Sequence, residues 1–144
     1  MFSKTCEYAI RAMLYIAQCS AKSLKTGIHD IAENVNAPEP FIAKILQDLV
    51  KKGLLSSVKG PGGGFYLDDA GLKRSLAEVV TAVDGDKIFS GCGLGLTYCS
   101  DAQPCPIHPR FKKLRQEIYD MLSSATLGEF HQQLDSREAF LKHI

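Results

Sequence analysis

The chain contains 144 residues, which is enough for about one domain with its own hydrophobic core. Apolar residues make up 45% of it and charged residues 23%, so a disordered or collagen-like chain is excluded. No apolar run approaches the roughly 18 residues of a membrane span, and the charges at Lys4 and Glu7 are unlike a secretion signal. We therefore expect a cytoplasmic protein that has no membrane partner.

The overall charge does not indicate nucleic-acid binding by itself. Seventeen Lys and Arg residues oppose sixteen Asp and Glu residues, which leaves a formal net charge of +1. Any DNA-binding surface must therefore come from local clustering of basic side chains.

Hydrophobic periodicity predicts three helices in the first part of the chain. Apolar residues recur at spacings of three and four over residues 2–20, 28–35 and 39–52. Thr26 is placed to cap the second of these helices. Two helices joined by a short turn, of which the second is longer, form the pattern of a helix-turn-helix.

A β-hairpin is predicted directly after this pair of helices. Residues 54–58 and 65–67 are β-prone, and the Gly- and Pro-rich residues 59–64 between them supply a turn. A hairpin in this place is the wing of a winged helix. Such a domain binds DNA or, as the alternative, serves only to dock another protein.

The rest of the chain predicts more helices around one long loop. Helical periodicity covers residues 75–83 and 110–125, and Thr126 with Glu129 forms a capping box for a last helix. Residues 87–109 show no period, and a loop of that length is usually functional or disordered. We predict a mainly α fold with a small β-hairpin wing. Its expected parts are a winged helix-turn-helix DNA-binding domain (1–84), a cysteine-bearing loop (85–109), and a dimerisation helix with a C-terminal helix (110–144).

The helix over residues 110–125 carries a seam that suits a dimer. Its apolar residues are spaced as in a heptad repeat: Phe111, Leu114, Ile118 and Met121. A helix-turn-helix normally needs two-fold symmetry to read two half-sites, which favours a homodimer across this seam. The alternative is a helix buried against its own domain.

Candidate DNA-binding residues come from the third helix and the tip of the wing. They are Glu39, Phe41, Lys44, Gln47 and Lys51 on the helix, and Lys59 and Gly60 on the wing. Lys44 suits a phosphate or a guanine edge, and Gln47 suits adenine. Phe41 fits the core better than a thymine methyl group. Lys59 suits a phosphate or the minor groove, and the neighbouring glycine allows close approach of the backbone.

Three of the five cysteines crowd into the long loop, as Cys92-x6-Cys99-x5-Cys105 with His108 close behind. An odd number of cysteines in a reducing compartment argues against disulfides. The surrounding Gly and Pro residues supply sharp turns and exposed amides, which suit an iron–sulfur cluster with thiolate ligands. Structural zinc sites usually have ligand gaps of about two to four residues, so zinc fits less well. Zinc and no metal at all are the two alternatives.

An iron–sulfur electron carrier or enzyme is the alternative from a different functional class. The helix-turn-helix and wing favour a DNA-binding regulator instead. The sequence shows no second cluster motif, no nucleotide-binding loop and no catalytic set of Ser, His and Asp. We therefore predict that the protein is not an enzyme.

Several segments resemble the Rrf-two family of bacterial winged-helix transcription regulators, which includes iron–sulfur sensors of the IscR and NsrR types. The first is TCEYAIRAMLYIA at residues 5–17. The most specific is LVKKGLLSSVKGPGGGF at residues 49–65, where the recognition helix runs into the wing. Residues 75–84 and 126–129 are also similar, so the resemblance covers nearly the whole chain.

The resemblance implies a homodimer that controls transcription at double-stranded promoter DNA. It implies an iron–sulfur cluster of the 2Fe–2S or 4Fe–4S type, bound by Cys92, Cys99 and Cys105, whose loss, oxidation or nitrosylation changes that control. The fourth ligand it implies is either His108 or Glu7, the latter supplied by the first helix of the other subunit. The first cysteine gap is usually five residues in this family and is six here, which leaves both choices open.

Overall fold

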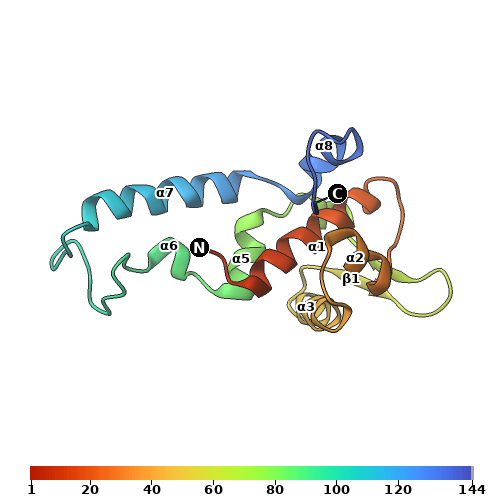
Figure 1. The fold of residues 1–144 in the computed structure, drawn as a ribbon, viewed down its shortest axis with the longest axis horizontal. Coiled ribbons are helices and arrows are strands. Elements are labelled where there is room, and N and C mark those ends of the chain that lie inside the picture. Colours follow the sequence, from red (N-terminus) through yellow and green to blue (C-terminus); the bar gives the residue numbers. More distant parts are fainter. Residues whose placement is uncertain (144) are drawn as a thin grey trace.

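The computed structural model describes residues 1–143, which are mostly helical with one two-stranded sheet (Figure 1). In chain order the elements are α1 (Lys4–Ser20), α2 (Ile28–Val35), α3 (Glu39–Lys51), β1 (Ser56–Val58), β2 (Gly64–Tyr66), α4 (Asp69–Leu72), α5 (Leu76–Asp84), α6 (Lys87–Ser90), α7 (His108–Ser124), the 3-10 helix η1 (Leu127–Phe130) and α8 (His131–Asp135). The two strands are antiparallel, with Ser56 opposite Tyr66 and Val58 opposite Gly64. The predicted mainly α fold with a hairpin wing is confirmed.

The hydrophobic core lies where α1, α2 and α3 pack together. Its fully buried large side chains are Met13, Ile16, Ile31, Ile42, Leu46 and Leu49. The four of these positions that belong to α2 and α3 fall on one stripe of each helix, as the sequence period predicts. Burying that stripe of α3 turns the opposite face of the helix to solvent.

Thr26 joins the wing to the helix-turn-helix, although it does not cap α2 as predicted. The N-cap of α2 is Gly27, which makes no side-chain hydrogen bond. The Thr26 hydroxyl donates to the Asp30 carboxylate at 2.7 Å. Its backbone N–H and C=O pair with Phe65 of β2 at 3.1 and 2.8 Å. The buried Thr26 is therefore used as a link between the hairpin and α2.

The long helix α7 projects away from this core, with α6 beside it (Figure 1). The loop that joins α6 to α7 lies at the far end of the projection, opposite the hairpin (Figure 1). After α7 the chain returns to α1, where Leu127 is fully buried and Asp135 accepts from Gln18 at 2.8 Å. The division into three parts stays a prediction, with η1 and α8 lying against the winged domain.

The sequence did not predict the short helices α4 and α6. Each has four residues, too few to show a hydrophobic period. The last predicted helix is divided into η1 and α8. At its start the Glu129 carboxylate accepts a hydrogen bond from the Thr126 N–H at 3.0 Å, as expected of the capping box.

Candidate nucleic-acid interface and cysteine site

The outer face of α3 carries every candidate DNA-binding residue predicted for that helix. All five are exposed to solvent: Glu39, Phe41, Lys44, Gln47 and Lys51. The prediction that Phe41 belongs to the core is wrong, because 60% of its surface is exposed. Phe41 does not belong to the buried stripe of α3, which consists of Ile42, Ile45, Leu46 and Leu49.

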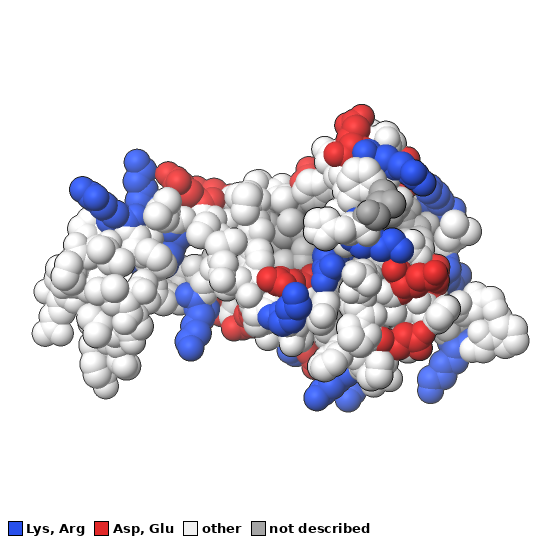
Figure 2. Space-filling view, in the orientation of Figure 1, with Lys and Arg blue, Asp and Glu red and all other residues white. Residues whose placement is uncertain are grey.

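The lysines on α3 and at its C-terminal end differ in their ion pairs and hydrogen bonds. Lys52 pairs with Asp48 at 3.0 Å and donates to the Ala82 carbonyl, which ties it to α5. Lys44 and Lys51 make no ion pair or side-chain hydrogen bond within residues 1–143. Figure 2 shows lysine and arginine side chains projecting from the lower edge, below α3 and the wing. These positive charges are therefore available to a partner.

Glycine is required in the turn of the wing. A Cβ atom on Gly63 would lie 2.1 Å from the Val58 carbonyl oxygen, far inside the contact distance. Gly60 and Gly62 have φ values of +89° and +73°, which favour glycine. The turn places Lys59 and Gly60 at the exposed tip, and Lys59 makes no ion pair within residues 1–143. The wing thus presents one free cation on a closely folded backbone.

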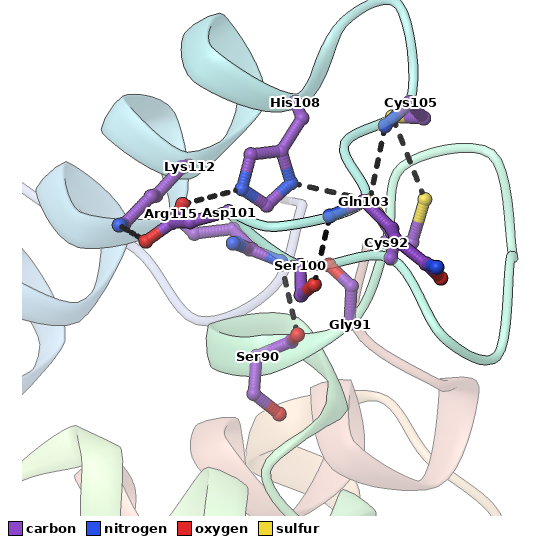
Figure 3. A network of polar contacts seen from close by, with 11 residues as sticks. Ser90, Gly91, Cys92, Ser100, Asp101, Gln103, Cys105, His108, Lys112 and Arg115 are labelled. Atoms are coloured by element: carbon purple, nitrogen blue, oxygen red, sulfur yellow. Dashed lines mark hydrogen bonds and ion pairs between the residues drawn. The ribbon is translucent and has the colours of Figure 1, made fainter.

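The three loop cysteines converge near the start of α7, and Figure 3 shows two of them, Cys92 and Cys105. The Sγ atoms of Cys92, Cys99 and Cys105 all lie within 4.8 Å of one another. Cys92 and Cys105 are 3.7 Å apart between sulfurs, and Cys105 is buried. Two backbone N–H groups also donate to sulfur. The Leu94 N–H donates to Cys92 Sγ, and the Cys105 N–H donates to Cys99 Sγ, both at 3.4 Å.

The surroundings divide the cysteines into more and less acidic thiols. Backbone N–H groups of Leu96 and Leu94 lower the pKa of Cys92 to about 7. The Cys105 N–H also favours the thiolate of Cys99, but burial and the neighbouring thiols outweigh it and raise the pKa of Cys99. Burial in the core raises the pKa of Cys6 to about 12, as expected of an inert hydrophobic cysteine. The surroundings therefore favour the thiolate form at Cys92 and disfavour it at Cys99.

His108 lies against the cysteines as the first residue of α7. It is only 8% exposed, and its Nδ1 is 3.1 Å from the Cys99 sulfur. Its Nε2 is 2.8 Å from Asp101 Oδ1, and Asp101 Oδ2 is 2.7 Å from Lys112 Nζ (Figure 3). Lys112 and then His108 hold the pKa of the Asp101 carboxyl below its usual value.

Arg115, on the same face of α7 as His108 and Lys112, connects the helix to the segment before Cys92 (Figure 3). Its guanidinium donates to the backbone carbonyls of Ser90 and Gly91, at the end of α6. It also lies over the Phe111 ring, 5.7 Å from the centroid. A Cβ on Gly93 would lie 2.9 Å from that ring, so the glycine allows the loop to pack on Phe111. These contacts hold the backbone next to Cys92 in place.

Comparison with known proteins decides the family. A family model described as "Rrf2: Iron-dependent Transcriptional regulator" matches residues 2–133. The chain belongs to the Rrf2 family. The transcriptional regulator IscR of Vibrio vulnificus (strain YJ016) is 34% identical over 122 residues, which cover 85% of this chain and 71% of IscR.

Solved structures share the Rrf2 fold over almost the whole chain. CymR of B. subtilis, described as the global cysteine regulator, has a TM-score of 0.76 at 20% identity, covering 94% of this chain and 98% of CymR. IscR of T. potens has a TM-score of 0.73 at 21% identity, covering 96% of this chain and 91% of that IscR. The Rrf2 relatives are transcription regulators and not enzymes. This confirms two predictions for this chain, that it is a transcription regulator and that it is not an enzyme.

Not every predicted site residue of this Rrf2 chain reaches the cysteines. His108 does, whereas Glu7 on α1 is exposed and pairs with Lys4 at 3.4 Å. Arg11, one turn after Glu7, donates to the Val35 carbonyl at 2.9 Å and does not pair with Glu7 within residues 1–143. Within residues 1–143 of one chain, the group of potential metal ligands consists of the three cysteines.

Three polar residues around the Rrf2 cysteine loop were missed by the sequence analysis. They are Asp101, Lys112 and Arg115. A signal for two of them was present, because His108, Lys112 and Arg115 are spaced by four and three residues and so share one face of α7. No such spacing marks Asp101, which comes from the loop.

The seam of α7 is only partly covered by its own chain. Leu114 and Met121 are 53% and 55% exposed. Phe111 packs on Gly93, and Ile118 packs against the cluster that contains Val80 and Leu122, so both are half-buried. The helix has apolar residues that its own domain does not cover.

None of the helices described over residues 1–143 has the length and apolar character needed to cross a membrane.

Proposed function

We propose that this protein is a cytoplasmic, homodimeric transcription regulator whose affinity for double-stranded promoter DNA is controlled by an iron–sulfur cluster. The observation that carries the proposal is the convergence of three cysteine sulfurs within 4.8 Å, at the tip of a helix that projects from a winged domain. The name of the matched family model, an iron-dependent regulator, supports it.

The donor set fits an iron–sulfur cluster. Thiolates are its preferred ligands, and backbone N–H groups directed at the sulfurs stabilise their negative charge. A cluster bound there supplies a group that is sensitive to redox state and to reactive small molecules. Three cysteines leave one position for a further ligand. His108 of the same chain is the choice supported by its contact with Cys99, and Glu7 of the partner subunit is the alternative.

This chain's own contacts offer a route from the cysteine loop to the winged domain. Leu122 of α7 is buried against Cys6 of α1 and Val80 of α5. The Asp84 carboxylate, at the end of α5, accepts from the Ser3 N–H at 2.9 Å, next to the start of α1. A change in the order of the loop therefore acts through α5 on α1, and α1 packs directly against α2 and α3.

The deciding experiment is spectroscopy of protein purified without oxygen, with iron and sulfide analysis. Visible absorbance with matching iron and sulfide establishes the cluster. A colourless protein that contains zinc overturns the cluster and favours a zinc-binding regulator, and one without metal favours metal-free regulation. DNA affinity is then measured with and without the bound group, because the proposal requires the two values to differ.

Replacing Lys59 with alanine is expected to weaken binding to all DNA sequences alike. Neutralising a phosphate releases counterions, so the slope of log affinity against log salt should fall in size by about 0.9 for each phosphate that Lys59 neutralises, or about 2 in a dimer. Fluorescence anisotropy over a range of salt concentrations measures this slope. Lys113→Ala on α7, also an exposed lysine, is the control and should keep the wild-type slope. An unchanged slope for Lys59→Ala contradicts a phosphate contact at the wing.

Replacing Gly63 with alanine is expected to displace the wing and lower DNA affinity by about tenfold, the effect of removing one or two DNA-binding side chains. The reason is the 2.1 Å approach of the added Cβ to a backbone oxygen that cannot move aside without changing the turn. The control is Gly27→Ala, since that Cβ meets nothing within 4 Å. Equal affinity of the two variants would show that the wing does not touch DNA.

A further inference from the structure

Asp101 connects the cysteine site to the solvent side of α7. One of its carboxylate oxygens is 2.8 Å from His108 Nε2, and the other is 2.7 Å from Lys112 Nζ (Figure 3). His108 and Lys112 are four residues apart, so both face the same side of the first two turns of α7. The Asp101 carboxylate of the loop thus bridges the side chains of His108 and Lys112 on α7.

The bridge determines which nitrogen of His108 faces the cysteines. An ionised carboxylate only accepts hydrogen bonds, so the proton of the neutral imidazole is required on Nε2. Nδ1 then carries the lone pair, and it lies 3.1 Å from the Cys99 sulfur. A nitrogen ligand binds a metal through its lone pair, and a carboxylate on the opposite nitrogen fixes the ring and raises the basicity of that ligand.

We propose that Asp101 is a positioning residue that presents His108 Nδ1 to the cysteine site as the fourth ligand. The inference rests on the proposed function, because it assigns a role within that site. An ordinary surface ion pair between Asp101 and Lys112 is the competing explanation, since both side chains are exposed. Such a pair contributes little and would not act through His108.

A double-mutant cycle separates the two explanations. Cobalt(II) is titrated anaerobically into the metal-free, reduced full-length protein, and its thiolate and d–d absorption bands report binding and the presence of a nitrogen ligand. Asp101→Ala is expected to lower cobalt affinity by about 10–100-fold. The double variant Asp101→Ala/His108→Ala should be no weaker than His108→Ala alone, because Asp101 acts only through His108. Asp101→Asn keeps an acceptor oxygen and should fall between wild type and alanine.

The matched control is Lys112→Met, which removes the ion pair and leaves the contact between Asp101 and His108. It should bind cobalt within about twofold of wild type, and its d–d bands should not move. Additive losses in the cycle, or an Asp101→Ala variant equal to wild type, overturn the positioning role. Unchanged affinity in His108→Ala also overturns it.

Iron and sulfide analysis of the wild type keeps the two proposals apart. A wild type that assembles a cluster while the cycle fails refutes only the role of Asp101. If His108→Ala also keeps the wild-type affinity, the result points to Glu7 of the partner subunit as the ligand. A wild type that assembles no cluster, but binds cobalt as the cycle requires, refutes the cluster and retains Asp101 as the positioning residue of a Cys3His metal site.

Discussion

Replacing Cys105 with serine is expected to abolish cluster assembly and to fix DNA affinity at the value of the metal-free protein. Cys105 is the most buried of the three loop cysteines, and its sulfur is 3.7 Å from that of Cys92. Serine is a poor ligand for iron in a cluster, and the loss of one thiolate opens an iron to solvent. Iron and sulfide should fall to background, and the visible bands should disappear.

The control for this prediction is Cys19→Ser. Cys19 is a half-buried cysteine near the end of α1, outside the loop, and it should leave iron content, absorbance and DNA binding unchanged. Circular dichroism of both variants checks that the helices are intact. A Cys105→Ser protein that keeps the wild-type iron and sulfide content would remove the cysteine site from the proposed mechanism. A Cys105→Ser protein that lacks the cluster but binds DNA with the affinity of the cluster-containing wild type would show that the cluster does not control DNA affinity.

The sequence predicted the winged helix well because its signals are local. The apolar residues of α1, α2 and α3 repeat at helical spacing, and the stripe of α3 that includes Leu46 and Leu49 is buried as expected. The turn of the wing is marked by its glycines, and the structure shows that Gly63 has no room for a side chain. The crowding of three cysteines predicted their convergence for the same reason.

Other features depend on contacts between distant segments and so leave no pattern in the sequence. Phe41 looks like a core residue by type, but only the packing of α3 on α1 shows that it faces solvent. Asp101 meets His108 and Lys112 because the loop folds back on α7, a path that neither spacing nor composition specifies. Thr26 bonds to the hairpin instead of capping α2, since β2 lies beside it.

The exposed part of the α7 seam leads to the second large effect. Leu114→Asp is expected to convert the protein into monomers and to weaken binding to a two-half-site operator by at least about 100-fold. Leu114 is 53% exposed in one chain, so the change removes little packing within the subunit. It does place a charge where we expect a partner helix, and burying an unpaired charge is costly. Sedimentation measures the mass, and anisotropy measures the affinity.

Ile118 is a less suitable position for this test than Leu114. It packs against the cluster of Val80 and Leu122, so a charge there also disturbs the fold of one chain. Met121, 55% exposed, provides a second test of the seam. Gln116→Asp adds the same charge on the opposite, exposed face of α7 and should stay dimeric with wild-type affinity. A Leu114→Asp variant that sediments as a dimer would show that the subunits meet elsewhere. A wild type that is monomeric at micromolar concentration would refute the dimer, and with it a fourth ligand from the partner subunit.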